Sequence, residues 1–235
     1  MLQIKNFTKK YGDFTAVDDI SFNVNKGEIC AFIGHNGAGK STTIKAIVGA
    51  LNFNNGEILV DGISIKEKPI EAKKIMAYIP DNPDIYEYLT GIQYLNFVCD
   101  VFRVKNEERN NLISQYADEF ELTNNLNDLI SSYSHGMKQK LVIISALIHN
   151  PKLLILDEPF VGLDPIATHK LKNIMREICN NGGAIFFSTH ILEVAEKLCD
   201  KVIIIKDGKI IKQGDMQELV KDKSLENLFL EIANV

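Results

Sequence analysis

Hydrophobic residues along the chain follow two patterns. Continuous apolar runs bounded by glycine or polar residues are typical of strands buried on both faces, and they occur at 28–33 (EICAFI), 152–159 (KLLILDEP) and 184–188 (AIFFS). Between these runs, apolar residues recur every three or four positions, which indicates amphipathic helices. Because strands and helices alternate, the pattern predicts an α/β core with a mainly parallel sheet.

Three helical segments place apolar residues on one face. They are 41–51, 141–148 and a segment that starts at Asp164 and Pro165, a pair that favours a helix start because aspartate caps and proline fits the first turn. The residues expected on the inner faces are Ile44, Ile47, Val48 and Leu51 in the first, Leu141, Ile144, Ser145 and Ile148 in the second, and Leu171, Ile174, Met175 and Ile178 in the third.

Further strands are expected at 2–7, 20–24 and 56–62, and the segment 201–214 predicts a two-stranded ribbon around Asp207-Gly208, a strong hairpin pair. Residues 85–130 contain helix-like segments without a β-branched run, which indicates an inserted helical region. The tail 224–235 is helix-like, and we expect no added regulatory domain after it.

Composition limits the functional classes. The chain has 235 residues, enough for a sizeable core, and a net charge of −5, which disfavours a nucleic-acid partner bound through a broad basic surface. The four cysteines form no CxxC pair, so we expect reduced, buried thiols and neither zinc nor redox chemistry. The start of the chain carries no secretory signal, and the longest apolar runs are too short to span a bilayer. Any membrane role therefore requires a partner.

The segment GHNGAGKST at 34–42 lies between a predicted buried strand and a predicted helix, where a phosphate-binding loop belongs. Its glycines let backbone N–H groups turn inward, and the helix adds its positive dipole end. Lys40 can reach the β- and γ-phosphates, and Ser41 can ligate Mg²⁺. The pattern arises by chance in about one per cent of chains of this length. The residues expected to bind a nucleoside triphosphate here are Gly34, Asn36, Gly37, Gly39, Lys40, Ser41 and Thr42.

A second acidic element, Asp157 and Glu158, ends the predicted strand of 152–159. Asp157 can hold Mg²⁺ through water, and Glu158 can polarise an attacking water as a general base. Two acids at a strand end are common, so this motif alone is weak evidence for a nucleotide site. Together with the loop at 34–42 it is stronger evidence. Both would meet at one edge of a parallel sheet.

Three further segments resemble motifs of a known protein family. With the two motifs above, YSHGMKQK at 133–140, VGLD at 161–164 and STH at 188–190 occur in the order found in the ATP-binding subunit of an ATP-binding cassette (ABC) transporter. The resemblance covers nearly the whole chain. It implies a P-loop NTPase core with an N-terminal antiparallel β subdomain, over 1–80 and 150–235, and an inserted helical subdomain over about 85–149, together forming one ABC ATPase domain.

The resemblance also implies roles for single residues. Tyr11 would stack on adenine, although a tyrosine beside a turn glycine is equally ordinary. Ser134 and Gly136 match the signature sequence, which binds the γ-phosphate held by an opposite subunit, so two copies would face each other head to tail. Asp164 matches the loop between the two sites and is also a plain helix cap. His190 matches the histidine that contacts the γ-phosphate and orients water.

Three positions depart from the family pattern. Asp81 stands where glutamine is usual after a proline, in a loop that touches Mg²⁺ and the membrane partner. A carboxylate can still ligate Mg²⁺, and Asn82 can substitute by a one-residue slip. His135 replaces the first glycine of the signature and can donate to phosphate. Val161 replaces a common serine, with no large effect expected.

The sequence thus predicts an ATPase subunit with ATP and Mg²⁺, pairing with itself or a homologous subunit and driving a separate integral membrane permease, in the export direction, at the cytoplasmic face of the membrane. An alternative is an ABC-type ATPase that remodels a cytosolic assembly. A P-loop kinase or GTPase is disfavoured because no NKxD guanine motif is present, and because the signature segment and His190 have no role in those enzymes. Aromatic and apolar residues before and within the helical region either anchor the partner or form core: Tyr86, Tyr88, Leu89 and Tyr94.

Overall fold

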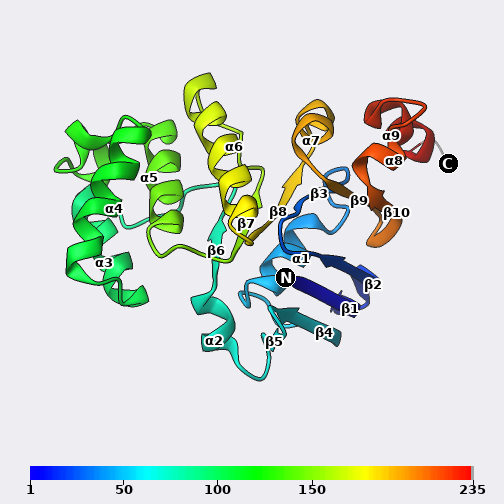
Figure 1. The fold of residues 1–235 in the computed structure, drawn as a ribbon. Coiled ribbons are helices and arrows are strands. Elements are labelled where there is room, and N and C mark those ends of the chain that lie inside the picture. The colour runs from blue at the N-terminus through cyan, green and yellow to red at the C-terminus, as the bar shows by residue number, and fades with distance from the viewer. Residues whose placement is uncertain (234–235) are drawn as a thin grey trace.

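The computed structural model describes residues 1–233 and contains two β-sheets. The smaller sheet is antiparallel, in the order β2-β1-β4-β5, and the larger runs β10-β9-β3-β8-β7-β6 (Figure 1). Within the larger sheet all pairings are parallel except that of β10 with β9. The strands are β1 (Leu2–Tyr11), β2 (Phe14–Val24), β3 (Ile29–Ile33), β4 (Asn55–Val60), β5 (Ile63–Ser64), β6 (Met76–Ile79), β7 (Leu153–Asp157), β8 (Ala184–Thr189), β9 (Lys201–Lys206) and β10 (Lys209–Asp215).

Helices surround the larger sheet, and one group projects from it. Helices α3, α4 and α5 lie together beyond β6 at one end of the molecule (Figure 1). The helices are α1 (Lys40–Ile47), α2 (Pro69–Lys74), α3 (Gly91–Phe102), α4 (Asn106–Glu119), α5 (His135–Leu147), α6 (Pro165–Asn180), α7 (Leu192–Leu198), α8 (Met216–Leu219) and α9 (Leu225–Ala233), with short 3₁₀ turns η1 (Thr123–Asn125) and η2 (Ile130–Ser132).

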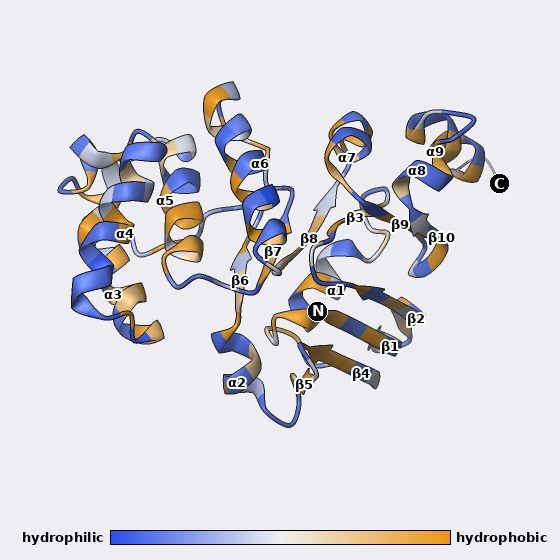
Figure 2. Cartoon of the chain, in the orientation of Figure 1, coloured by the Kyte–Doolittle hydropathy of each residue, from blue (hydrophilic) through white to orange (hydrophobic). Residues whose placement is uncertain are grey.

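The continuous apolar runs become strands because both faces of the larger sheet are covered. In β3, Ala31 packs into a core shared with the helical group, whereas Phe32 packs into a second core shared with α1 and the smaller sheet. Phe22 of β2 stacks on Phe186 of β8 with ring centroids 5.4 Å apart, which joins the two sheets. Hydrophobic colour accordingly lies along the central strands and the inner helix faces (Figure 2).

The α/β class, the mainly parallel sheet and the antiparallel ribbon over 201–214 are confirmed. The ribbon turns at Asp207 and Gly208, whose φ values of 49° and 77° suit a two-residue hairpin. The four cysteines are free and buried, as expected. The first helix ends at Ile47, earlier than predicted, because Gly49 adopts a φ of 66°. Ile178, expected to point inward, is only partly buried.

Other differences concern short elements and the tail. Helices α2 and α7 have six and seven residues and were not predicted, since so short a segment shows little periodicity. The expected tail helix is α9, and the last two residues of the predicted segment, 234 and 235, lie outside the described residues. Within residues 1–233, no helix combines the length and apolarity that crossing a bilayer requires.

Candidate active site

Residues 34–39 form a tight loop between β3 and α1. Gly37 and Gly39 have φ values of 84° and 107°, which favour glycine. A Cβ atom at Gly39 would lie 2.8 Å from the carbonyl oxygen of Ala16, and one at Gly34 would lie 2.5 Å from that of Ile205. Glycine is therefore required at both ends of the loop, because β2 and β9 pack directly against it.

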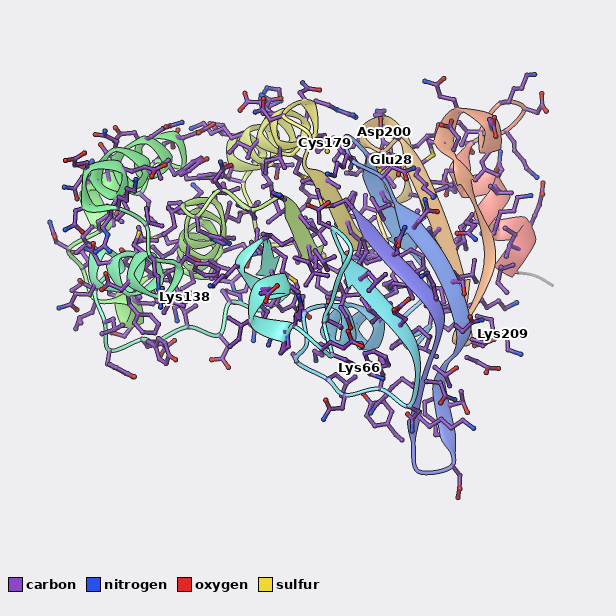
Figure 3. All side chains as sticks on the ribbon, turned by 60° about the horizontal axis from the view of Figure 1, so that its bottom comes forward. Glu28, Lys66, Lys138, Cys179, Asp200 and Lys209 are labelled. Carbon is purple, nitrogen blue, oxygen red and sulfur yellow. The ribbon has the colours of Figure 1, made fainter. Side chains whose placement is uncertain are left out.

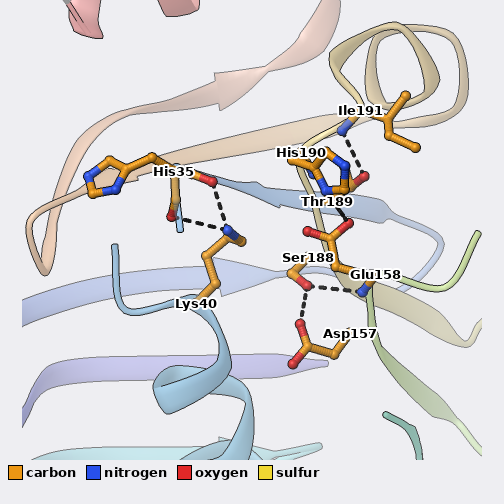
Figure 4. A network of polar contacts seen from close by, with 9 residues as sticks. His35, Lys40, Asp157, Glu158, Ser188, Thr189, His190 and Ile191 are labelled. Atoms are coloured by element: carbon orange, nitrogen blue, oxygen red, sulfur yellow. Dashed lines mark hydrogen bonds and ion pairs between the residues drawn. The ribbon is translucent and has the colours of Figure 1, made fainter. Parts of the chain in front are cut away.

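Lys40 is folded back onto this loop. Its Nζ donates to the carbonyl oxygens of Gly34 at 2.7 Å and His35 at 3.2 Å (Figure 4). The residue is 7% exposed. Burial lowers the pKa of the Lys40 ammonium, and the nearby charges of Glu158 and Asp157 act in the opposite direction. The lysine and the two acids thus share one electrostatic environment, because β3 and β7 flank β8 in the same parallel sheet and end at the same edge.

Asp157 ends β7 directly opposite Ser188 of β8. The Ser188 hydroxyl donates to Oδ1 of Asp157 and accepts the backbone N–H of Glu158 at 3.2 Å (Figure 4). Asp157 and Ser188 are 2% and 0% exposed. A buried carboxylate is costly unless it is hydrogen-bonded, so Ser188 both stabilises Asp157 and fixes its direction.

Glu158 adopts a φ of 49°, a left-handed conformation that is strained for a residue with a side chain. Its Oε2 lies 2.9 Å from Nδ1 of His190 and accepts the backbone N–H of His190 at 3.3 Å (Figure 4). The backbone turn after β7 and the loop after β8 therefore bring together the two residues that the sequence singled out at 158 and 190.

Tyr11 borders an open groove beside the loop. This groove has a volume of about 330 Å³, and the phosphate-loop residues expected to bind ATP line it, except Gly34. Tyr11 is 49% exposed, and Nζ of Lys9 lies 4.7 Å from the centroid of its ring. The lining residues are Tyr11, Phe14, Ala16, Asn36, Gly37, Gly39, Lys40, Ser41 and Thr42.

Asp81 follows β6 and is exposed, and its Oδ1 accepts the backbone N–H of Asn82 at 2.9 Å. The charge of Asp81 acts on Tyr78 together with that of Asp157, but burial is the main cause that raises the pKa of this phenol. Asp81 thus lies at the same sheet edge as Asp157 with its carboxylate turned onto its own loop.

Ser134 and Gly136 lie at the start of α5, in the helical group rather than beside the loop at 34–42 (Figure 1). Ser134 is the N-cap of α5, and its Oγ accepts the backbone N–H of Met137 at 3.2 Å. A Cβ atom at Gly162 would lie 2.8 Å from Cδ2 of His135, so the histidine that departs from the family pattern packs onto the segment 161–164. The signature of this chain and its own phosphate loop are therefore separate features.

Asp164 is the N-cap of α6, and its carboxylate accepts the backbone N–H of Ala167 at 2.8 Å. Its Oδ2 also lies 2.7 Å from Nζ of Lys140 in α5. Both contacts lower the pKa of Asp164, that from Ala167 most. The cap predicted from the Asp-Pro pair is confirmed, and the ion pair fastens the segment 161–164 to α5.

The four candidate anchor residues divide into two pairs. Tyr86 and Tyr88 are 48% and 75% exposed, with ring centroids 5.9 Å apart. Leu89 and Tyr94 are partly buried and pack against the core. The core interpretation therefore holds for Leu89 and Tyr94, and the partner-anchor interpretation of Tyr86 and Tyr88 stays a prediction.

Sequence reasoning missed two contributors to the site. Ser188 was noted only as part of a motif, although a hydroxyl at the end of an apolar strand was a usable signal. Phe14 was not noted at all, because an aromatic residue in a strand is ordinary. Within residues 1–233, no group of three or more His, Cys, Asp or Glu side chains could hold a metal ion unaided.

The oxygen donors that the site does offer are hard ligands. The Ser41 hydroxyl lies beside the phosphate loop, and the buried Asp157 carboxylate lies at the end of β7, two strands from β3 in the same sheet. This donor set suits Mg²⁺ bound jointly with phosphate oxygens and water. The arrangement of a phosphate loop, a buried acid and a fixed carboxylate can bind a nucleoside triphosphate and position water for attack.

The sequence of the chain is similar to those of known proteins of one family. The family model described as "ABC transporter" matches residues 17–161. The chain is 35% identical over 237 residues to the ABC-type transporter ATP-binding protein EcsA of Bacillus subtilis (strain 168), covering 99% of this chain and 96% of that protein. It is also 35% identical over 219 residues to the linearmycin resistance ATP-binding protein LnrL of the same organism, covering 93% of this chain and 70% of LnrL.

A solved structure described as "Structure of ATP binding subunit of ABC transporter" superposes with a TM-score of 0.95 at 35% identity, covering 99% of both chains. Cassettes that are 24% identical, one of them solved as a dimer with ADP and phosphate, share the fold. The chain therefore belongs to the ABC transporter family as an ATP-binding subunit, which hydrolyses ATP to power transport.

Proposed function

We propose that this protein binds ATP with Mg²⁺ between two copies arranged head to tail and drives export through a separate integral membrane permease. The observation that carries the proposal is the Lys40, Asp157, Ser188, Glu158 and His190 cluster at one edge of the sheet.

Nucleotide binding requires Lys40 to change partners. Its ammonium now donates to two loop carbonyls, and the β- and γ-phosphates would replace them, a stronger charge-assisted contact. The base would lie toward Tyr11, and the loop N–H groups and the N-terminus of α1 would face the phosphates. Mg²⁺ would be held by Ser41 and, through water, by Asp157, with Asp81 or Asn82 turning in from the neighbouring loop.

Hydrolysis would use Glu158 as the base. Its carboxylate is fixed by His190 and shielded, with 16% of the side chain exposed. A positioned carboxylate of this kind can take a proton from water as the oxygen attacks the γ-phosphate. His190 would orient the carboxylate and contact the γ-phosphate.

The second subunit would complete the site. Ser134 and Gly136 begin a helix of 13 residues whose N-terminus can bind an anion. These residues lie in the helical group, away from the loop of the same chain, which favours recognition of a phosphate held by another copy or by a homologous subunit. Asp164, adjacent to α5 through Lys140, would link the two sites.

A groove of about 390 Å³ between the core and the helical group offers a place for the membrane permease. It is lined by apolar and aromatic side chains with a few polar ones, the mixture found at binding surfaces. The lining residues are Val48, Ala50, Lys73, Met76, Ala77, Tyr78, Tyr94, Val98, Phe102, Ser145, Ala146 and His149. Docking there would hold the protein at the cytoplasmic face of the membrane.

Export is favoured over import by the relative LnrL, whose name assigns it to resistance, because removal of a compound provides resistance to it. The domain would act as one unit, with residues 1–80 and 150–235 as core and about 85–149 as the helical subdomain. No nucleic-acid partner is proposed, because the net charge is −5.

Co-purification from the native cell tests the proposal. We expect tagged protein, solubilised in mild detergent, to carry one polytopic membrane protein in a one-to-one ratio. Val98→Asp should remove that partner while Ile211→Asp, an exposed residue on β10, should retain it; thermal unfolding checks that both variants fold. A soluble scaffold as the sole partner, with the protein missing from membranes, would overturn the transport assignment and leave the ATPase chemistry standing.

A further inference from the structure

Phe14 lies directly opposite Tyr11. The two residues pair across the two-residue turn that joins β1 to β2. Residues directly opposite in an antiparallel pair project their side chains to the same face, with Cβ atoms about 5 Å apart. The turn projects beyond the rest of the smaller sheet (Figure 3). The residues on both sides of the turn border the same groove as the phosphate loop. The sequence therefore places two aromatic rings side by side on one face of this hairpin.

Both rings border the groove that contains the phosphate loop. The strand β2 packs closely against that loop. A Cβ atom added to Gly39 would lie only 2.8 Å from the carbonyl oxygen of Ala16. Ala16 lies two positions after Phe14 in the same strand and also lines the groove. The position of Phe14 relative to the phosphates is thus set by the core of the hairpin and not by the flexible turn alone.

Both rings are largely exposed to solvent. Phe14 is 66% exposed and Tyr11 is 49% exposed, whereas Phe7, Phe32, Phe120, Phe186 and Phe187 are less than 2% exposed. The Lys9 ammonium, which also donates to the Asn52 carbonyl oxygen at 2.7 Å, lies over the Tyr11 ring. One face of Tyr11 is therefore occupied, and a base would use the rest of this aromatic surface.

We propose that Phe14 is a second nucleobase contact, which together with Tyr11 and Ala16 holds the base by stacking and apolar contact. The proposal rests on the proposed function, since it presumes that the triphosphate lies on the loop at 34–42. At this end of the groove the Tyr11 hydroxyl is the one side-chain hydrogen-bonding group among these three residues. Every base has a π-face, so such a surface contributes affinity without reading exocyclic groups.

The test separates base contact from phosphate contact. ATP and inorganic tripolyphosphate are titrated with Mg²⁺ into a non-hydrolysing Glu158→Gln protein, alone and with Phe14→Ala, Phe14→Leu or Phe14→Tyr. Stacking of one base on an aromatic ring corresponds to about a tenfold change in Kd. We expect Phe14→Ala and Phe14→Leu to weaken ATP about tenfold and leave tripolyphosphate unchanged, and Phe14→Tyr to restore ATP. GTP should follow ATP within a few-fold in each protein.

Unchanged ATP affinity in Phe14→Ala, or an equal loss for tripolyphosphate, would overturn the assignment, because the second result places the effect on the loop. The proposed function fails separately if Lys40→Ala alters neither ligand.

The chain contains no tryptophan, which provides an independent reporter. In Phe14→Trp the indole is the single tryptophan, and stacking of a base should quench its emission while tripolyphosphate should not. Phe97→Trp on α3, where the native residue is 46% exposed, is the matched control and should respond to neither ligand. Equal responses to ATP and tripolyphosphate at position 14 would contradict base contact.

Discussion

Glu158 is bound twice by His190: the imidazole Nδ1 lies 2.9 Å from Oε2 of Glu158, and the backbone N–H donates to the same oxygen at 3.3 Å. The two residues come from the ends of neighbouring strands β7 and β8. Because one carboxylate oxygen is fixed from two directions, the proposed base is oriented before nucleotide binds. This preorganisation is what a proton transfer to a positioned carboxylate requires.

Replacing Glu158 with glutamine removes the basic oxygen and keeps the shape. We expect kcat for ATP hydrolysis to fall by about 10²–10⁴-fold, the range for loss of a general base. ATP binding should persist, and size-exclusion chromatography with ATP should show a dimer. Glu193→Gln, an exposed residue paired with Lys197, is the matched control and should hydrolyse normally. Near-normal turnover in the Glu158 variant would refute the base assignment.

His190→Ala should act through orientation and contact with the γ-phosphate. Loss of the imidazole leaves only the backbone N–H on Glu158, so we expect kcat to fall by about 10²–10³-fold with the Kd for ATP changed far less. Steady-state kinetics and calorimetric titration give the two quantities. His169→Ala on α6, whose side chain contacts Asn173, controls for loss of a histidine. A loss seen in Kd alone would mean that His190 binds ATP without serving hydrolysis.

Ser188→Ala would leave the buried Asp157 carboxylate without its hydroxyl donor. The expected cost is about 1–3 kcal/mol in the free energy of unfolding, the penalty for an unsatisfied buried group. Urea unfolding measures it, with Ser131→Ala, an exposed serine, as the control. Equal unfolding midpoints for both variants would show that Ser188 does not support Asp157.

The sequence alone predicts that Lys40 and Asp157 lie close together in one site. Lys40 follows one buried strand and Asp157 ends another, and both strands lie in one parallel sheet, so their proximity follows from the alternation of strands and helices. Sequence could not show that Ser188 lies in register with Asp157, since the order of strands in a sheet is a tertiary property. Nor could it show that Asp81 bonds to its own loop, because that depends on backbone geometry.

Asp164 provides a pH-dependent test of the link between α5 and α6. The backbone N–H of Ala167 and the Lys140 ammonium lower the pKa of Asp164 below its ordinary value of 3.8. The charged form therefore stabilises the fold at pH values above 3.8, and this stabilisation is lost as the pH falls through the lowered folded-state pKa. Asp164→Ala removes cap and charge, so at neutral pH it should lower the free energy of unfolding by about 1 kcal/mol.

Asp164→Asn keeps an N-cap and removes the charge, because asparagine is as good an N-cap as aspartate but cannot pair with Lys140. We expect a smaller loss at neutral pH, about 0.2–1 kcal/mol for a partly exposed ion pair. The loss should shrink as urea unfolding is repeated toward the acid limit of the folded protein, since the parent carboxylate then becomes neutral too. Asp84→Asn in an exposed loop should show no such trend. A difference that stays constant with pH would mean that the Lys140 contact contributes nothing and that the cap geometry alone matters.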